Sequence, residues 1–503
     1  MNFLREYQKP HVEHLLKVLR TNRAALDASD TGTGKTPCAL ALAQALDCVP
    51  LILCPKSVIP SWEEWSERVG VPAQIINYEG ARGVSRYIKK PLAETWAEIQ
   101  LQCCAEWKEF EVFAEWARST KFQETRRLAR EDEDEAYSPN NCRWALGPRE
   151  TESAFGHEVL CARGSRWQWG QAYEMAIFDE VDRCSGATSL QSKMLIAAKR
   201  QFRYVHTMSA TAADSPLKLK ALGYALGLHS LSDYKWWLFK HGVKPGVFGG
   251  FQFPANSDDP LVAAEARQAI LDLNSTLFPA RAARLRKADI PGFPKTIIDA
   301  RLLDPTDKAR RLAGEIAELY QQRRAQQDDA ATALEKLIRA RQALELLKVP
   351  DMKEFAVDYA QSCPVVCFVN YRETAKQLAA ALSKALGCEV PILDGDTSAE
   401  DRGHIEKDMQ GNRLPALVAN TAAGGVGIGF HDPFKQTERV SLFSPPDRAD
   451  LLKQGFGRVN RDGGGFSQQY LLVFRGTEEE SIATNVRAKA DRIDLLNDGD
   501  LTP

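Results

Sequence analysis

The sequence contains no long hydrophobic run, and its longest apolar stretches, such as Val49 to Cys54, have only the length of a strand. A membrane-spanning helix needs about 20 apolar residues, so we expect no membrane span. The eleven cysteines lack the short, even spacing of a secreted disulfide framework. The first residues, MNFLREYQKPH, also lack an apolar signal core. We therefore expect a soluble protein of a reducing cytoplasm, with no membrane partner.

The sequence also carries almost no net charge, with a formal value of −2 at pH 7. This balance argues against a broadly basic surface, so a nucleic acid would have to bind at local positive patches. The 503 residues are too many for one ordinary core. At about 100–200 residues per domain, this length predicts roughly three structural units.

The most informative N-terminal segment is SDTGTGKT, residues 29–36. An apolar run at Ala24 to Asp27 precedes it and a helical pattern at Pro37 to Leu46 follows, which is the strand–loop–helix context of a phosphate-binding loop. Its glycines would let backbone N–H groups approach an anion, Lys35 would reach the β- and γ-phosphates, and Thr36 would hold Mg²⁺. The alternative is an ordinary glycine turn capped by Thr36. The predicted nucleotide-binding residues are Ser29, Asp30, Thr31, Gly32, Thr33, Gly34, Lys35 and Thr36.

A second candidate element is Asp179-Glu180-Val181-Asp182, which directly follows a predicted strand at Met175 to Phe178. Acidic side chains at the carboxyl end of a parallel strand lie at the edge where α/β proteins bind ligands. We expect Asp179 to bind Mg²⁺ and Glu180 to orient or deprotonate the attacking water. The alternative is that these carboxylates only cap the following helix.

Near the C-terminus, the segment QGFGRVNR at Gln454 to Arg461 places two arginines in a short stretch of chain. A phosphoryl-transfer site needs positive charge against the γ-phosphate, and an arginine from a distant part of the chain can supply it. We expect Arg458 and Arg461 to be catalytic in this way, which requires two lobes to close on the nucleotide. The alternative for these arginines is a surface salt-bridge pair.

Short apolar runs alternate with helical patterns in two separate parts of the chain, which predicts an α/β protein with two parallel sheets. Between them, Pro305 to Lys348 repeats apolar residues at helical spacing and predicts a pair of long helices that span the lobes. Residues 82–171 hold most of the tryptophans and are too long for a structureless loop, so we expect an insertion. The predicted strands are Ala24–Asp27, Pro50–Cys54, Met175–Phe178, Tyr204–Met208, Pro364–Val369, Glu389–Leu393, Ala416–Ala419, Arg439–Phe443 and Gln469–Phe474. The predicted domains are 1–275 with the insertion 82–171, a lobe-linking segment and helical pair at 276–348, and 349–503.

Further motifs occur in order along the chain. They are Tyr7-Gln8, Cys54-Pro55-Lys56-Ser57, Asn77-Tyr78-Glu79, Arg284-Leu285-Arg286-Lys287, Phe368-Val369-Asn370-Tyr371, Asp394-Gly395-Asp396-Thr397 and the run TAAGGVG from Thr421 to Gly427. With the segments above, they resemble the motif series of superfamily-two helicases and translocases, closest to the Swi/Snf-related branch and its compact viral or bacterial members. The resemblance covers nearly everything except the insertion. Two departures shift the sequence toward helicases: Asp182 stands in place of histidine, and Ser209-Ala210-Thr211 stands in place of Gly-Thr-Pro.

The resemblance implies two RecA-like parallel-sheet lobes joined by a helical linker, with ATP and Mg²⁺ between them. It implies that Gln8 contacts adenine and that Gly427 and Gln454 complete the nucleotide site. The implied function is that of a monomeric, DNA-dependent ATPase, a translocase or helicase acting on duplex or branched DNA in replication, recombination or repair. The implied location is the cytoplasm of a bacterial cell or a virus-infected host. Nucleic-acid contacts are implied for Lys56, Ser57, Arg372, Thr397 and Thr421.

Several alternatives stay open. The chain could be a nucleotide-gated clamp that binds DNA or a protein partner and uses hydrolysis only for release. The insertion could bind a protein partner, or its tryptophans could stack on unpaired bases, although tryptophans along helical stretches favour a core.

Cysteines and a histidine of the insertion could form a zinc site, or could be small buried residues. These candidate ligands are Cys103, Cys104, Cys142, His157 and Cys161.

Overall fold

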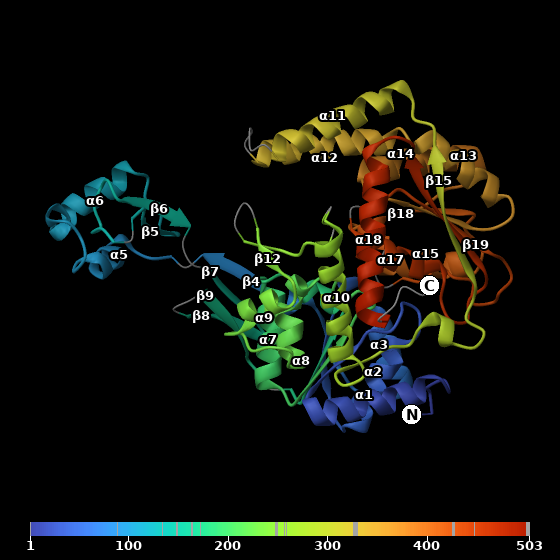
Figure 1. Cartoon of the computed structure of the whole chain (residues 1–503), viewed down its shortest axis with the longest axis horizontal. Helices are drawn as coiled ribbons and strands as arrows, with labels where there is room; N and C mark the ends of the chain where they lie inside the picture. The colour runs from blue at the N-terminus through green and yellow to red at the C-terminus, as the bar shows by residue number, and fades with distance from the viewer. Residues whose placement is uncertain are drawn as a thin grey trace. The chain divides into compact units, whose positions relative to one another are not determined.

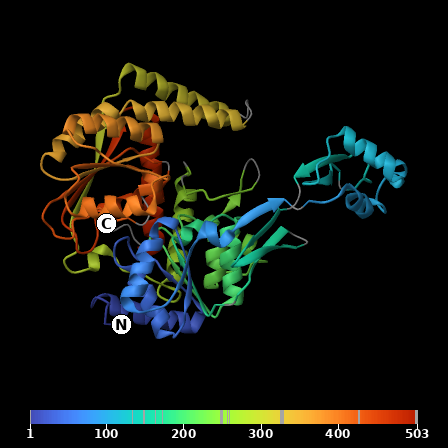
Figure 2. The ribbon, with the colours of Figure 1, turned by 180° about the vertical axis from the view of Figure 1, so that it is seen from behind.

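The computed structural model describes residues 2–498 apart from 88, 133, 147–148, 162–163, 172, 247–249, 256, 258, 325–329, 425–427 and 447. The chain forms two compact units, residues 1–77 with 173–503 and residues 78–172. The larger unit contains two parallel sheets, each at the centre of a lobe, and the smaller unit is the insertion (Figures 1 and 2).

The first lobe is built on a six-stranded parallel sheet in the order β14-β1-β11-β10-β2-β3. Its central strands are buried along their whole length, as expected when helices cover both faces of a parallel sheet. The strands are β1 (Ala24–Asp27), β2 (Pro50–Cys54), β3 (Gln74–Asn77), β10 (Met175–Asp179), β11 (Tyr204–Met208) and β14 (Ala282–Ala283). The helices are α1 (Gln8–Asn22), α2 (Lys35–Ala45), α3 (Ile59–Val69), α7 (Leu190–Gln201), α8 (Lys220–Leu226), α9 (Tyr234–Lys240) and α10 (Pro260–Leu277). Shorter elements are η1 (Lys56–Val58), η3 (Val181–Cys184), η4 (Pro216–Leu219), η5 (Lys287–Asp289) and the hairpin β12 (Lys244–Pro245) with β13 (Phe251–Gln252).

The second lobe is also built on a six-stranded parallel sheet, in the order β15-β20-β19-β16-β18-β17. Alternate residues of β16 pack in two different hydrophobic clusters, because successive side chains of a strand point to opposite faces of the sheet. The strands are β15 (Thr296–Leu303), β16 (Val365–Val369), β17 (Ile392–Leu393), β18 (Ala416–Asn420), β19 (Arg439–Phe443) and β20 (Ser467–Phe474). The helices are α11 (Asp307–Arg324), α12 (Ala330–Leu346), α13 (Val349–Ala360), α14 (Arg372–Leu386), α15 (Ala399–Gln410), α16 (Thr421–Gly424), α17 (Ala449–Val459) and α18 (Glu478–Asp498).

The insertion forms its own compact unit with a small aromatic core. Its antiparallel sheet has the order β4-β7-β8-β9, and a second hairpin pairs β5 with β6. Trp107 is fully buried and packs edge-on against Phe113 at 5.0 Å, which favours the core interpretation of the tryptophans. The elements are α4 (Tyr78–Arg82), β4 (Val84–Tyr87), α5 (Leu92–Ile99), η2 (Ala105–Lys108), α6 (Phe110–Ser119), β5 (Arg126–Arg130), β6 (Cys142–Leu146), β7 (Arg149–Ser153), β8 (Gly156–Cys161) and β9 (Gly164–Trp169).

The proposed zinc site receives no support in the described part of the chain. Cys103 lies in the aromatic core, with Cys104 and Cys142 packed against it. The histidine at 157 is exposed, and the side chain of Cys161 lies outside the described residues. Among the described side chains, no group of three or more histidine, cysteine or acidic residues is placed to hold a metal. The cysteines of this core therefore behave as small apolar residues.

Every predicted strand of the two sheets is present, but the segment between the lobes differs from the prediction. Thr296 to Leu303 forms the edge strand β15, paired with β20 along its whole length. The predicted helical pair is present as α11 and α12, and its buried residues, such as Ile316 and Leu337, share a core with the second sheet. The pair is thus packed as part of the second lobe. None of the helices in the described residues combines the length and hydropathy needed to cross a membrane.

Candidate active site between the two lobes

Three loops of the first lobe meet because their strands are neighbours. Strands β1, β11 and β10 lie side by side and parallel, so their carboxyl ends share one edge of the sheet. The loops that follow carry SDTGTGKT, Ser209-Ala210-Thr211 and Asp179-Glu180. This edge is where open α/β sheets bind ligands. The structure therefore brings the sequence-predicted phosphate loop and acidic residues together.

The phosphate loop curls around the Lys35 ammonium group. Lys35 Nζ donates hydrogen bonds to the carbonyl oxygens of Ser29, at 2.8 Å, and Asp30, at 3.0 Å. Gly32 and Gly34 adopt φ values of 83° and 87°, a left-handed conformation that favours glycine. A Cβ atom at Gly34 would also overlap the side-chain amide of Gln8. The glycines are thus required both by the backbone and by the close packing of Gln8.

The N-terminal motif contacts this loop directly. The Gln8 amide Nε2 donates to the carbonyl oxygen of Thr33 at 3.0 Å, and Gln8 is buried. Tyr7 donates its hydroxyl to Asp462 of the second lobe, which Arg5 also contacts at 2.6 Å. Burial raises the pKa of Tyr7 above its usual range, and its hydrogen bond to Asp462 raises it further. Sequence reasoning missed this Arg5–Asp462 contact, because no local pattern links positions so far apart.

The acidic pair lies in the same site. Asp179 Oδ2 accepts a hydrogen bond from the indole Nε1 of the fully buried Trp62 at 2.9 Å. Burial raises the pKa of Asp179, and the neighbouring Glu180 raises it further. Burial and the neighbouring carboxylate destabilise the charged form of Asp179, which a bound cation would relieve.

The donor set fits Mg²⁺. Thr36 and Asp179 line the same cavity, and they offer the hydroxyl and carboxylate oxygens that Mg²⁺ accepts. Mg²⁺ commonly keeps one or two protein carboxylates and takes its other ligands from water and substrate phosphates. A site with a single hydroxyl and a single carboxylate beside a phosphate loop matches that pattern.

The arginine segment of the second lobe packs against the phosphate loop. A Cβ atom at Gly457 would overlap Thr31 Oγ1, and one at Gly32 would lie 3.0 Å from Arg461 Cγ. Arg458 and Arg461 both donate to the carbonyl oxygen of Ile428, at 3.3 and 3.1 Å. The two predicted arginines therefore lie at the loop, and they are not a surface salt-bridge pair.

The same arginines place buried positive charge in the site. Burial, together with repulsion from Arg461, lowers the pKa of Arg458 to about 9. Burial also lowers the pKa of Arg461. Nearby His431 is held neutral, because burial and Arg461 lower its pKa to about 4. Buried positive charge of this kind favours the binding of a polyanion such as a nucleotide triphosphate.

A cavity of about 310 Å³ collects these residues from both lobes. Its lining from the first lobe includes Gln8, Thr31, Gly32, Gly34, Lys35, Thr36, Trp62, Asp179 and Glu180. Its lining from the second lobe consists of His431, Arg458, Arg461 and Asp462.

Not all predicted nucleotide residues line this cavity. Gln454 is buried and lines a neighbouring cavity of about 540 Å³ with Glu180, Asp182 and Thr211. Gly427 lies outside the described residues. In the loop after β11, Ser209 donates its hydroxyl to Asp182 at 2.8 Å. The acidic segment is therefore joined to Ser209-Ala210-Thr211 at the wall of this second cavity.

The predicted nucleic-acid residues lie mostly on exposed loops. Lys56 is exposed and Ser57 is half-buried at the start of η1. Arg372 forms an exposed ion pair with Asp396 at 2.6 Å, which places it beside Thr397. Thr421 differs from the expectation, because it is buried and donates its hydroxyl to the carbonyl oxygen of Val369. Its hydroxyl is therefore not presented to a phosphate in this structure.

Comparison with known proteins matches this chain to helicases. Residues 347–463 match the family described as helicase conserved C-terminal domain, a span that contains both arginines. Over 98% of its length, the chain is 26% identical to the putative ATP-dependent RNA helicase L364 of Acanthamoeba polyphaga mimivirus, of which it covers 84%. Both matches are to helicases, so the chain is similar to superfamily-two helicases over these spans. The predicted ATP-hydrolysing enzyme with two RecA-like lobes is thereby confirmed.

Two further comparisons match this chain, one over a short span and one by its fold. Over 136 residues, the chain is 27% identical to the pre-mRNA-splicing ATP-dependent RNA helicase PRP28 of Saccharomyces cerevisiae. This match covers 27% of this chain and 22% of PRP28. Among solved structures, the chain is similar to S. cerevisiae Dbp5 bound to RNA and ADP BeF3, with 13% identity and a TM-score of 0.43. That match covers 95% of this chain and 86% of the other.

Proposed function

We propose that this helicase uses ATP hydrolysis to separate or remodel RNA strands. This proposal replaces the duplex-DNA translocase and the repair role expected from the Swi/Snf-related motifs. It is supported by the relative that matches nearly the whole chain, which is named an RNA helicase. Asp182 and Ser209-Ala210-Thr211 also favour a helicase over a duplex translocase, because they are the two departures toward helicase sequences.

The observation that carries the proposal is the packing of the arginine segment against the phosphate loop, at Gly457 and Thr31. In this arrangement Lys35 binds the β- and γ-phosphates, and Arg461 with Arg458 neutralises charge that develops on the γ-phosphate. Glu180 orients or deprotonates the attacking water. Mg²⁺, held by Thr36 and Asp179, would neutralise phosphate charge.

Coupling to the polymer would pass through the loop after β11. The Ser209–Asp182 hydrogen bond joins the acidic segment to the cavity of about 540 Å³, which Arg448 and Gln454 line from the second lobe. We place RNA on exposed basic residues of both lobes, with Lys56 in the first and Arg372 in the second. The exposed ion pair of Arg372 with Asp396 is weak, so a phosphate can replace the carboxylate. Such phosphate contacts carry no sequence preference.

The experiment compares RNA and DNA of identical sequence as single strands, duplexes and forks. ATP hydrolysis and strand displacement are measured for each polymer at fixed salt, with Lys35→Ala as the inactive control. We expect RNA to stimulate hydrolysis and RNA duplexes to be separated. Stimulation by DNA alone would refute the choice of RNA. Hydrolysis with nucleotide-dependent release but no displacement or movement would instead support the clamp.

A further inference from the structure

Helix α18 is anchored in the second lobe at its start. Glu479, in its first turn, contacts the fully buried Lys348 at 2.6 Å and accepts a hydrogen bond from the backbone N–H of Phe474 at 3.0 Å. The ion pair is buried, so breaking it would leave an uncompensated charge in the core. The 21 residues of α18, at about 1.5 Å each, then span roughly 31 Å.

The other end of α18 is attached to the first lobe. Asn497 donates to the carbonyl oxygen of Ala210, at 3.0 Å, in the loop after β11. The carbonyl oxygen of Leu496 accepts a hydrogen bond from Asn274 of α10 at 2.8 Å. Asp498 forms a two-pronged ion pair with Arg284, whose Nε and Nη2 donate to its two carboxylate oxygens. One rigid helix thus connects both lobes.

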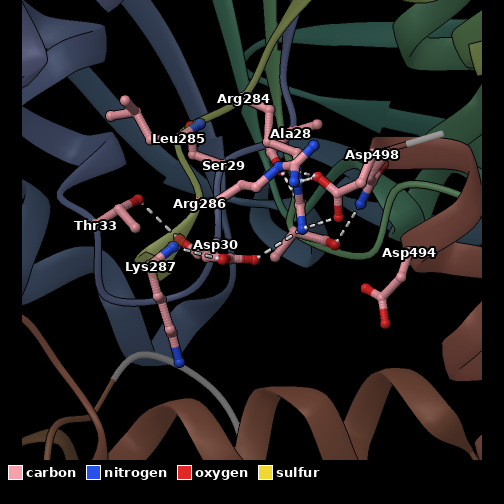
Figure 3. A network of polar contacts seen from close by, with 12 residues as sticks. Ala28, Ser29, Asp30, Thr33, Arg284, Leu285, Arg286, Lys287, Asp494 and Asp498 are labelled. Atoms are coloured by element: carbon pink, nitrogen blue, oxygen red, sulfur yellow. Dashed lines mark hydrogen bonds and ion pairs between the residues drawn. The ribbon is translucent and has the colours of Figure 1, made fainter. Parts of the chain in front are cut away.

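Arg284 also contacts the phosphate loop, and so connects the end of α18 to it. Its Nη1 donates to the carbonyl oxygen of Ala28 at 2.7 Å, and its Nη2 lies 3.1 Å from Asp30 Oδ1. Figure 3 shows Arg284 reaching between Asp498 and Asp30, with Arg286 also directed at Asp498. The side chains of Arg284 and Asp498 are only 9% and 6% exposed, so water screens this ion pair little.

The backbone beside Arg284 holds the same loop. The N–H of Leu285 donates to Ser29 Oγ at 2.9 Å, and the N–H of Lys287 donates to Asp30 Oδ2 at 2.9 Å. Ser29 and Asp30 are the two residues whose carbonyl oxygens hold the Lys35 ammonium group. The side chains of both residues are therefore fixed by the segment 284–287, and their backbones fix Lys35.

We propose that Asp498 and Arg284 are positioning residues for ATP hydrolysis, and that α18 links the placement of the second lobe to the geometry of the phosphate loop. When the second lobe moves, α18 moves with it, and its last residue changes the support of Ser29 and Asp30. The proposal rests on ATP hydrolysis at the two-lobe site and is independent of which polymer is bound. According to this proposal, the end of α18 affects catalysis as well as packing against the first lobe.

The test measures steady-state ATP hydrolysis by Asp498→Asn and Arg284→Lys, each with and without single-stranded RNA. Asp498→Asn removes the charge, and Arg284→Lys keeps the charge but loses the planar fork. The matched control is Glu480→Gln, which removes a charge at the other end of α18 and away from Arg284. We expect kcat to fall about 10- to 100-fold in Asp498→Asn, because small misplacement of catalytic groups costs this much. KM for ATP should change less than about threefold, and Arg284→Lys should be intermediate.

Thermal unfolding and the double variant separate positioning from folding. The double variant Arg284→Lys/Asp498→Asn should lose little more activity than Asp498→Asn alone, because both changes break one contact. Unchanged kcat in both single variants would overturn the proposal, as would a fall in kcat that appears only where the protein has unfolded. If Asp498→Asn does not fold, the kcat of Arg284→Lys alone tests the proposal. A wild-type rate that RNA does not stimulate would refute the RNA proposal, while the basal rates would still test Asp498.

Discussion

Ionisable residues are buried directly beneath the phosphate loop. Asp27, at the end of β1, lies 3.2 Å from His11 Nε2 and accepts a hydrogen bond from the backbone of Ser29. Burial alone would raise the pKa of Asp27, but the charge and hydrogen bond of His11 and the charge of Lys35 lower it overall. The loop that carries Lys35, the proposed catalytic lysine, is therefore supported from below by a charged carboxylate.

The neighbouring residue His206 gives a prediction about how the free energy of unfolding depends on pH. It is fully buried in β11, and burial lowers its pKa to about 4 from the 6.5 of an exposed histidine. Between these values the unfolded chain binds a proton that the folded chain does not, so the free energy of unfolding must fall as the pH decreases from 6.5 toward 4. The expected loss is at most about 3 kcal/mol. In His206→Leu this component should disappear.

Denaturant unfolding of the first lobe at several pH values checks this expectation. Other groups, Asp27 among them, contribute acid sensitivity to both proteins, so the difference between wild type and variant is the informative quantity. Equal pH slopes in the two proteins would show that His206 is not held neutral.

For whole elements, sequence patterns predicted the buried strands well and the edges poorly. β15 was missed because seven of its eight residues are exposed, among them Ile297 and Ile298, so no alternation marks it. β14 is only two residues long and has no pattern of its own. The residues proposed to be catalytic could be named from the sequence because each sits in a local motif, and the structure places them around one cavity. The Arg284–Asp498 contact could not, because it depends on how α18 crosses between lobes.

The loop after β11 gives a prediction about coupling. Ser209 joins Asp182 by a hydrogen bond of 2.8 Å, whereas the phosphate loop holds Lys35 independently of it. Ser209→Ala should therefore keep ATP hydrolysis within a few-fold and reduce strand displacement by about 10-fold or more. Measuring both rates on the same RNA fork tests this. A parallel fall in the two rates would mean that Ser209 serves hydrolysis itself.

The insertion gives a prediction about its core. Trp107 is fully buried between Phe113 and Trp116, with ring centroids at 5.0 and 4.7 Å. Trp107→Ala should destabilise the insertion by about 3–5 kcal/mol and expose it to proteolysis. The matched control is Trp236→Ala, because Trp236 is 74% exposed and its loss should change stability by less than about 0.5 kcal/mol. Equal protease resistance of wild type and Trp107→Ala would contradict the core interpretation.

At the scale of the whole molecule, both lobes contribute residues to the cavity that holds the proposed ATP site. Lys35, Asp179 and Glu180 come from the first lobe, while Arg458 and Arg461 come from the second. On the proposed assignment, the first lobe alone has the groups that would bind phosphates and Mg²⁺ but lacks the arginines that would neutralise charge on the γ-phosphate. Binding and hydrolysis should therefore be separable by substitution.

The most direct test of this account is ATP hydrolysis by Arg461→Ala beside Lys35→Ala, with nucleotide binding measured on the same samples. We predict that both variants lose turnover by about 10³-fold or more, the effect of an arginine finger in comparable enzymes. Arg461→Ala should still bind ATP, because the phosphate loop is intact, whereas Lys35→Ala should bind it weakly. Normal turnover by Arg461→Ala would contradict hydrolysis between two closed lobes.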